Sequence, residues 1–321
     1  MNIMIMKFLA AAILPTLVTG QSPFTLRVLH MNDHHAHLGE DTLSIKTQTL
    51  PPEITVNINK TVVPEVKLTI GGFPRLMTLL NDMEQKSTAD AILKVHAGDV
   101  FSGTLFYTLF GGYADMQLMT PMCFDVMTLG NHDFDDGNVN LETFLTNLTK
   151  ATTDVCGSAT KVVSANVIPP ADTVLASLLL PYVIKDYDGQ EVAIIGLTTK
   201  DTADVASPDE GTQFLDEITA LTATVTELEG KGINKIIAMT HVGYDVDMKA
   251  ISSVKGVDVI IGAHSHTLLD KNLTDFIIEN SYVPLNYHEL GELLSIAGPY
   301  PTMSNNVCIV TAWCYAHVSI Q

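Results

Sequence analysis

Five short fragments of this 321-residue chain carry side chains that bind hard or borderline metal ions. The fragments are NDHH at 32–35, GD at 98–99, GNHDFD at 130–135, TH at 240–241 and GAHSH at 262–266. Each follows an apolar run typical of a buried strand, such as TLRVLHM before NDHH and KIIAM before TH. Because ligands bind at the carboxyl ends of the strands in an open α/β sheet, we expect these fragments to converge in one pocket.

The first two fragments offer carboxylate and imidazole ligands. Asp33 and His35 are separated by one residue, so in an extended segment they point to the same side and can reach one ion, while His34 faces away. Asp99 follows Gly98 at the end of a predicted strand. Its two oxygens can bridge two cations, and the glycine permits a close approach of the backbone.

The fragment GNHDFD is the most specific of the five. Asn131 offers a neutral carbonyl oxygen as a ligand, and the adjacent His132 cannot easily bind the same metal, which leaves it free for proton or charge work. Asp135 lies three residues further on, close enough to orient the imidazole. The alternative interpretation is a loop that only caps the following helix.

Three more histidines follow strands later in the chain. His241 ends one predicted strand, and His264 and His266 flank Ser265 after another. A single histidine at such a place is more often a structural hydrogen-bonding residue. Five donor-bearing strand ends in succession instead indicate a metal centre.

Strand-like and helix-like segments alternate along the chain, which predicts an α/β fold. We expect strands near 25–31, 91–97, 123–129, 161–165, 190–197, 234–240, 257–262 and 307–313. Helices are predicted over 73–86, 105–121, 139–150, 214–230 and 246–254. The insert at about 41–70 is too long for a plain connection and predicts a hairpin or flap beside the pocket. Residues 21–321 are expected to form a single domain.

The N-terminus predicts a secreted protein. An apolar segment, Phe8–Gly20, follows Lys7 and is too short to span a bilayer, so residues 1–20 are interpreted as a signal peptide, with an uncleaved anchor as the alternative. No stable membrane insertion is expected after cleavage. Sequons that begin at Asn59, Asn147 and Asn272 fit a glycosylated product.

The composition limits the classes of molecule that the protein is expected to bind. The formal charge is −19, which disfavours binding to a nucleic-acid polymer but allows a small phosphorylated substrate at a metal centre. Four cysteines, Cys123, Cys156, Cys308 and Cys314, allow three pairings into two disulfides. None has a CxxC spacing, so a cysteine zinc site is not expected. The sequence does not predict an oligomeric state.

Together these motifs resemble those of the calcineurin-like metallophosphoesterases, and more closely the catalytic half of secreted 5'-nucleotidases. The family pattern appears as D-x-H at 33–35, GD at 98–99, GNH(E/D) at 130–133, a histidine at 241 and a GHxH-like fragment at 262–266. Further similarity lies in GGFPRL at 71–76, GDVFSGT at 98–104 and SAN at 164–166. The resemblance covers residues 25 to about 318 and implies a four-layer α-β-β-α sandwich with a dimetal site at the strand C-terminal ends.

The resemblance also implies a role for each ligand. One divalent ion would be held by Asp33, His35 and His266, the other by Asn131, His241 and His264, and Asp99 would bridge them. His132 and Asp135 would form the catalytic dyad. Asp133 replaces the more usual glutamate, and Arg75 is interpreted as a packing or pairing residue at a helix start. Zinc is the favoured metal, with manganese, iron and cobalt as alternatives.

The implied activity is hydrolysis of nucleoside monophosphates or related phosphomonoesters by metal-activated water. Alternatives are a phosphodiesterase for 2',3'-cyclic nucleotides or nucleotide sugars, and a non-catalytic secreted protein that binds nucleotides or metal. In the family a linker helix and a base-binding C-terminal domain follow, whereas this sequence stops at Gln321. We therefore expect generic phosphomonoesters as substrates and poor discrimination among nucleosides.

Overall fold

The computed structural model describes residues 24–46, 57–58, 61–62, 65–269, 296–298, 302–305, 307–311 and 318–320. The predicted signal peptide at 1–20, the sequons at Asn59 and Asn272, and Cys314 lie outside these residues. Within the described segments, no helix has both the length and the apolar character that a bilayer span requires.

Two six-stranded sheets form the centre of the described structure. The first has the order β10 (Leu179–Leu180), β8 (Lys161–Val163), β7 (Val126–Thr128), β6 (Ala91–His96), β1 (Leu26–Met31) and β20 (Val318–Ile320). The second has the order β11 (Tyr182–Tyr187), β12 (Gln190–Thr198), β14 (Ile236–His241), β15 (Val259–Gly262), β19 (Val307–Thr311) and β18 (Thr302–Ser304). Neighbours pair in parallel except at β20, β11 and β18, which are antiparallel.

The central strands are apolar on both faces because both faces are covered. In β12, Val192 and Ile194 pack between the two sheets, while Ala193 and Ile195 alternate with them and pack on the outer face. Side chains of a strand alternate between its two faces, so a continuous apolar run supplies two cores at once.

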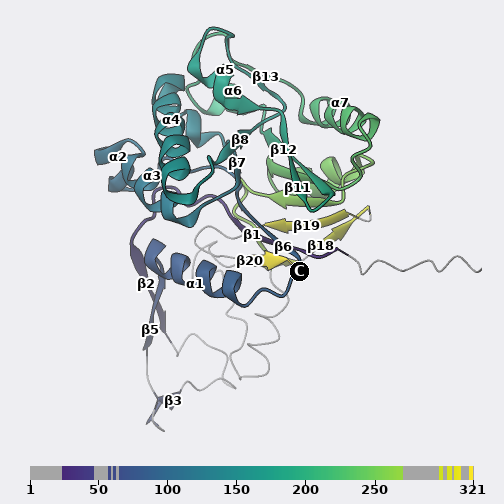
Figure 1. The fold of residues 1–321 in the computed structure, drawn as a ribbon. Helices are drawn as coiled ribbons and strands as arrows, with labels where there is room; N and C mark the ends of the chain where they lie inside the picture. Colours follow the sequence, from purple (N-terminus) through teal and green to yellow (C-terminus); the bar gives the residue numbers. More distant parts are fainter. Residues whose placement is uncertain are drawn as a thin grey trace, which may run out of the picture.

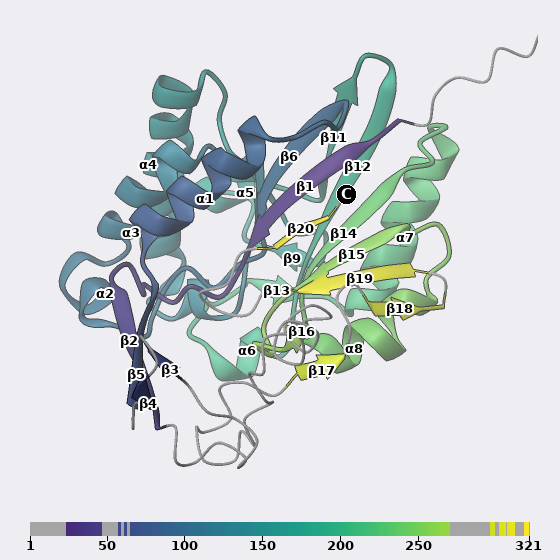
Figure 2. The ribbon, with the colours of Figure 1, turned by 90° about the horizontal axis from the view of Figure 1, so that it is seen from below.

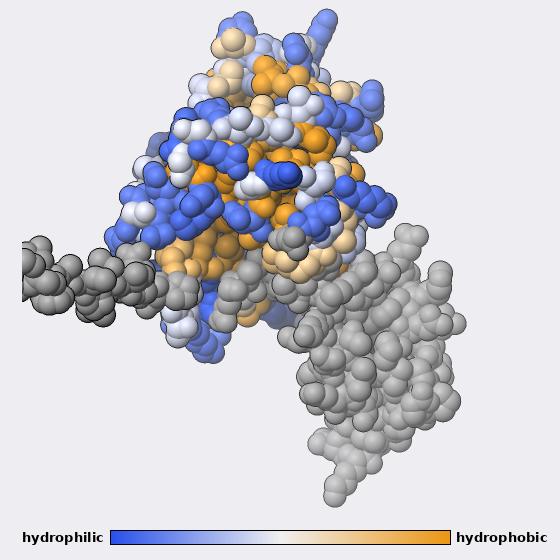
Figure 3. All heavy atoms as spheres, turned by 90° about the vertical axis from the view of Figure 1, so that its right-hand side faces the viewer, coloured by the Kyte–Doolittle hydropathy of each residue, from blue (hydrophilic) through white to orange (hydrophobic). Residues whose placement is uncertain are grey.

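Helices cover the outer face of each sheet. On the first sheet lie α1 (Phe73–Gln85), α3 (Tyr113–Met119) and α4 (Gly137–Cys156), which share a core with β1 and β7. On the second sheet lie α7 (Glu217–Gly230) and α8 (Tyr244–Lys249). Figures 1 and 2 show the strands between these two groups of helices, which is the predicted α-β-β-α arrangement. On the face at the right of Figure 1, hydrophilic side chains surround hydrophobic ones (Figure 3).

Two parts of the fold differ from or extend the sequence prediction. The helix expected over 105–121 is split into α2 (Leu105–Phe110), α3 and the 3-10 turn η2 (Thr120–Met122). The break falls at Gly111 and Gly112, whose φ angles of 55° and 89° an ordinary helix does not contain. The antiparallel strands β11, β18 and β20 were not predicted.

The expected insert contains paired strands. β2 (Glu40–Lys46) pairs antiparallel with β5 (Glu65–Gly71), and the short β3 (Asn57–Ile58) pairs with β4 (Thr61–Val62). Arg75, at the start of α1, donates a hydrogen bond of 2.8 Å to Glu40 Oε2 on β2. This ion pair confirms that Arg75 is a pairing residue at a helix start.

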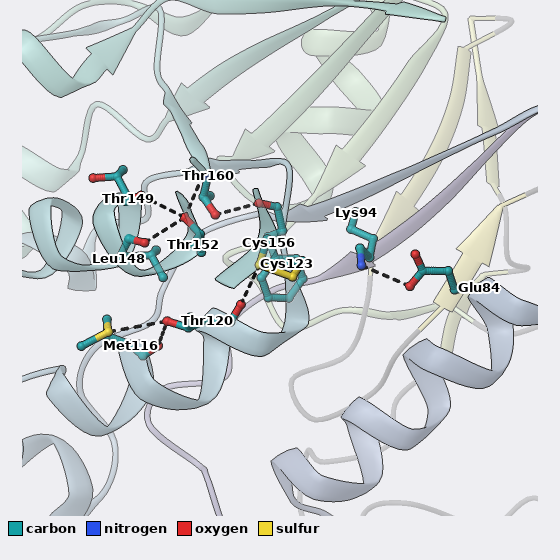
Figure 4. Close-up of a disulfide and its surroundings, with 11 residues drawn as sticks. Glu84, Lys94, Met116, Thr120, Cys123, Leu148, Thr149, Thr152, Cys156 and Thr160 are labelled. Atoms are coloured by element: carbon teal, nitrogen blue, oxygen red, sulfur yellow. Dashed lines mark hydrogen bonds and ion pairs between the residues drawn. A yellow bond between two sulfur atoms is a disulfide. The ribbon is translucent and has the colours of Figure 1, made fainter. Parts of the chain in front are cut away.

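The structure shows a disulfide between two of the four cysteines. Cys123 and Cys156 are bonded, which joins the end of α4 to the segment before β7 (Figure 4). Thr152 and Thr160 pack beside the bridge, and Thr160 Oγ1 donates to Phe124 O over 2.7 Å. Within the described residues, Cys308 on β19 is a free, half-buried thiol.

Candidate metal centre

The predicted ligands lie in two groups at the carboxyl ends of the strands. Asp33 and His35 follow β1 and form the first group with His266, which follows β15. The second group joins Asp99, after β6, with His241 at the end of β14 and His264. Within each group all the donor atoms lie within 4.8 Å of one another. Residues more than two hundred positions apart therefore meet as expected.

Asp99 belongs to the second group but also faces the first. Its Oδ2 is 3.0 Å from His241 Nε2 and 3.6 Å from His35 Nε2, which belong to different groups. Asp33 Oδ1 is 3.4 Å from His266 Nε2 and 3.7 Å from His241 Nε2. One oxygen of each carboxylate thus faces a histidine of each group, which is the geometry that a bridging ligand needs, and that of Asp99 makes the shortest of these contacts.

Backbone carbonyls fix the orientation of two of these histidines. His241 Nδ1 lies 2.8 Å from Ala97 O, and His35 Nδ1 lies 3.0 Å from Phe101 O. A carbonyl oxygen can only accept, so each Nδ1 carries a hydrogen, and Nε2 is the nitrogen that offers a lone pair when the ring is neutral. Metal-binding histidines are commonly held this way.

The ligand backbone is strained at five positions. Positive φ angles occur at the five residues Asp33 (48°), His35 (45°), Asp99 (56°), His264 (79°) and His266 (48°). Each costs about 1–3 kcal/mol for a residue other than glycine, and such strain persists where the surroundings over-determine it. Backbone hydrogen bonds supply that constraint, from Asp33 N to Gly98 O (2.9 Å) and from His35 N to Asp99 O (3.2 Å).

Two glycines let the GD and GNHDFD loops touch. A Cβ atom on Gly98 would lie 2.5 Å from Gly130 N, and one on Gly130 would overlap Asp99 Oδ1. Between Gly130 and His132, Asn131 is buried, and among the described residues its Oδ1 has no hydrogen-bond partner. A buried amide oxygen without a hydrogen-bond donor is free to bind a cation.

Asp133 is a positioning residue whose role the sequence did not reveal. Its carboxylate accepts hydrogen bonds from the backbone N–H groups of Gly130 (2.8 Å), Asp99 (3.1 Å) and Val100 (2.9 Å). Burial, followed by the charge of Asp99, raises the pKa of Asp133 to about 6. Its position three residues after Gly130 was the available signal, since a carboxylate at that spacing can bond back to the backbone of the turn.

His132 and Asp135 lie together at the open side of the site. His132 Nδ1 is 2.8 Å from Asp135 Oδ2, and the same oxygen accepts a hydrogen bond from Ser102 Oγ. Burial alone would lower the pKa of His132, but the hydrogen bond to Asp135 and the charge of Asp99 outweigh it and the pKa is raised. The His132 side chain is 40% exposed, so a substrate can reach it.

The electrostatics favour cations. Burial would raise the pKa values of Asp33 and Asp99, but neighbouring histidines, His241 above all, outweigh it and lower both pKa values. Burial would in turn lower the pKa of His241, yet the two carboxylates raise it to about 9. Two buried carboxylates with imidazole neighbours and the unpartnered Asn131 oxygen therefore fit a pair of divalent metal ions.

Comparisons with known proteins identify the relatives of this chain. The sequence pattern of the calcineurin-like phosphoesterases matches residues 26–268. A probable 5'-nucleotidase of Treponema pallidum is 33% identical over 299 residues, 91% of this chain and 43% of its own. An NAD 5'-nucleotidase of Haemophilus influenzae is 36% identical over 264 residues, 82% of this chain and 40% of its own.

The fold is similar to that of a solved relative. The 5'-nucleotidase precursor of Thermus thermophilus superimposes with a TM-score of 0.72 at 34% identity, covering 93% of this chain and 51% of the other. This chain spans less than half the length of the two curated relatives.

Proposed function

Because the chain belongs to the calcineurin-like phosphoesterase family, we propose that it is a metal-dependent phosphoric ester hydrolase of 5'-nucleotidase type. Its substrates would be nucleoside monophosphates or related phosphomonoesters. The observation that carries this proposal is the position of Asp99 Oδ2, 3.0 Å from His241 Nε2 and 3.6 Å from His35 Nε2. The two 5'-nucleotidase relatives support the choice of substrate class.

Seven residues would hold two divalent ions. The first ion would bind Asp33, His35 and His266, the second Asn131, His241 and His264, and Asp99 would bind both. When bound, the two ions would acidify a water molecule and neutralise charge on the phosphoryl oxygens. The mixture of imidazole, carboxylate and amide donors suits zinc, manganese, iron or cobalt, and the family resemblance favours zinc.

His132 and Asp135 would supply the protein's own catalytic groups. The raised pKa of His132 favours its protonated form, which can stabilise phosphoryl oxygens or donate a proton from Nε2 to the leaving alkoxide. Asp135, which accepts a hydrogen bond from Ser102 Oγ, would keep Nδ1 occupied, so that Nε2 faces the substrate. Gly98 and Gly130 would allow the two loops to approach closely enough for this geometry.

We also propose that the protein is secreted and glycosylated. The Cys123–Cys156 disulfide supports an oxidising compartment, where such bridges persist. Asn147, the sequon that the structure describes, is exposed on α4. The apolar segment at 8–20 would direct export.

A second candidate is hydrolysis of the pyrophosphate bond of dinucleotides or of phosphodiesters. It is favoured by one observation, the NAD 5'-nucleotidase of Haemophilus influenzae among the relatives. The same residues would bind either class of phosphate, so relative turnover of p-nitrophenyl phosphate, AMP, NAD and bis-p-nitrophenyl phosphate separates the two candidates.

The test is phosphate release by the purified chain with zinc or manganese added. We expect turnover of p-nitrophenyl phosphate and AMP that a chelator abolishes, with little discrimination among nucleoside monophosphates. Two bound equivalents of metal without turnover of any of these compounds would contradict the proposal and favour the non-catalytic binding protein.

A further inference from the structure

A row of three polar side chains is buried behind the metal ligands. His34, His96 and Asp115 are each 1% exposed or less. His34 lies between the ligands Asp33 and His35 in sequence, but its ring turns away, as expected for the alternate position. Its Nδ1 is 3.0 Å from His96 Nε2, and its Nε2 is 3.1 Å from Asp115 Oδ1 on α3.

The hydrogens in this row have a single consistent arrangement. Gly98 N, which can only donate, lies 3.2 Å from His96 Nδ1, so that nitrogen accepts. The neutral His96 ring then carries its hydrogen on Nε2 and donates to His34 Nδ1. His34 in turn carries its hydrogen on Nε2 and donates to the Asp115 carboxylate. Burial lowers the pKa of His96 well below its ordinary value, in agreement with a neutral ring.

The row connects two ligand loops with a helix. His34 belongs to the loop that carries Asp33 and His35, and Gly98 directly precedes Asp99. Asp115 anchors the far end in α3. Phe73 packs against the ring of His34 with centroids 5.1 Å apart, and Phe124 packs against His96 at 5.5 Å. The two aromatic rings exclude water from the buried row, so each hydrogen bond lies in a medium of low dielectric constant.

A contribution to folding stability does not by itself explain why these three buried residues are polar. Within the described residues, Asp115 Oδ2 is a buried oxygen without a hydrogen-bond partner, which carries a desolvation cost. Well-packed apolar side chains are often as stable as a buried ionic group or more so. A polar row at this place instead specifies one geometry, because its hydrogen bonds form only at one relative position of the two loops and α3.

We propose that His34, His96 and Asp115 form a positioning network that holds the Asp33–His35 loop and the Asp99 loop in their ligand geometry before metal binds. This inference rests on the proposed metal centre. The three residues act through the ligands and touch neither metal nor substrate. Their effect is on metal affinity, because a preformed site does not have to order its loops during binding.

The first test is the tautomeric state of both rings in the metal-free chain. Nitrogen NMR of ¹⁵N-histidine-labelled protein at pH 8, assigned with His34→Gln and His96→Gln variants, reports which nitrogen carries the hydrogen. We expect the hydrogen on Nε2 in both rings. A hydrogen on Nδ1 of either ring would break the chain of donors and overturn the proposal, whether or not the enzyme turns over substrate.

The second test is zinc affinity measured by competition with a chelator. We expect Asp115→Leu and His96→Leu to weaken zinc binding about 10–100-fold, the range for partners that orient metal ligands. Asp115→Asn retains an acceptor for His34 Nε2–H and should stay within about threefold of the wild-type affinity. Thr152→Val, which removes a buried hydroxyl from α4 beside the disulfide, is the matched control and should leave the affinity unchanged.

The outcomes separate this inference from the proposed function. A wild-type chain that binds no zinc contradicts the metal centre itself. A wild-type chain that binds two ions, together with leucine variants of unchanged affinity, contradicts only the positioning network. Melting temperatures of the variants show whether a loss of affinity reflects general unfolding, and if a leucine variant does not fold, the tautomers and Asp115→Asn still decide.

Discussion

The two sheets contribute to the metal centre in different ways. The loops after β1, β6 and β7 supply the two carboxylates and the amide, and all three are almost fully buried. The ends of β14 and β15 supply histidines, of which His241 is buried while His266 is 40% exposed. The first sheet therefore holds both carboxylates in the interior, and the second supplies imidazole nitrogens that range from the buried His241 to the exposed His266.

The loops also differ in how they are fastened. Those of the first sheet bond to one another through the backbone, from Ala36 N to Val100 O (2.9 Å) and through the three N–H groups that Asp133 accepts. The second sheet is attached across the pocket by fewer contacts, such as the bond from His264 N to the Asp33 carboxylate (3.1 Å). Changes in the first sheet should accordingly have the larger effects.

The largest effect is expected for Asp99→Asn. The change removes the charge that both ligand groups share, so we expect phosphomonoesterase activity to fall about 10³-fold or more, since the metal charge is worth several kcal/mol. Elemental analysis should find fewer than two equivalents of metal. Wild-type activity with two bound ions in this variant would show that Asp99 is not the shared ligand.

His132→Gln should reduce kcat without removing metal. General acid–base groups contribute about 10²–10⁴-fold, and the first-sheet ligands remain intact in this variant. The measurement is kcat for p-nitrophenyl phosphate together with metal content. If metal is lost in parallel with activity, His132 supports the ligand loops and does not act on the substrate.

Asp133→Asn and Ser265→Ala each alter one side chain that holds a ligand loop in place. Asp133 does so in the first sheet and Ser265 in the second. The amide introduced by Asp133→Asn would offer one oxygen where three N–H groups now meet a carboxylate, so zinc affinity should fall about 10–100-fold. Ser265 Oγ accepts a bond from Tyr244 N (3.0 Å) and shares another with Thr267 Oγ1 (2.8 Å) at an exposed position, so the loss of its hydroxyl should change the affinity by less than about threefold. Equal effects in a zinc titration would remove the distinction between the sheets.

The smallest effect on the chemistry of the site is expected for a change that acts on stability, and it comes from the second sheet. Asp247 on α8 is buried beneath Thr240 and Gly262, and burial raises its pKa to about 8, against the hydrogen bond from Thr240 and the charge of His241. Between its ordinary pKa of 3.8 and the raised value of about 8, the folded chain therefore binds a proton that the unfolded chain releases. The contribution of this group to stability is lost as pH rises through that window.

Asp247→Asn removes this dependence. Relative to wild type, the stability of this variant should increase steadily from pH 5 to pH 8, by at most roughly 4 kcal/mol, because one pKa unit corresponds to about 1.4 kcal/mol, and its melting temperature should rise accordingly. Asp245→Asn, on the same helix with a side chain 83% exposed, is the control and should show no such trend. A constant difference from pH 5 to pH 8 would mean that Asp247 is ionised in the folded chain.

Much of the site was predictable because its signals are local. A strand followed by a donor residue specifies both a place in the sheet and a chemistry, and the structure brings Asp33, Asp99 and His241 together in this way. The row from His96 through His34 to Asp115 was not predictable, because it depends on how α3 packs on the first sheet. The sequence indicated only that His34 turns away from the ligands.

Parts of the fold were missed for related reasons. The edge strands β11, β18 and β20 are held by antiparallel pairing with partners elsewhere in the chain. The pairing of Cys123 with Cys156 depends on where α4 ends, which spacing alone does not fix. The break between α2 and α3 could have been expected from Gly111 and Gly112, because adjacent glycines weaken a helix.

Anomalous X-ray scattering at the zinc edge, from crystals of the zinc-loaded chain, tests the central claim most directly. We predict two peaks on either side of the Asp99 carboxylate, one beside His35 and His266 and the other beside His241 and His264. A single peak, or peaks remote from Asp99, would contradict the account.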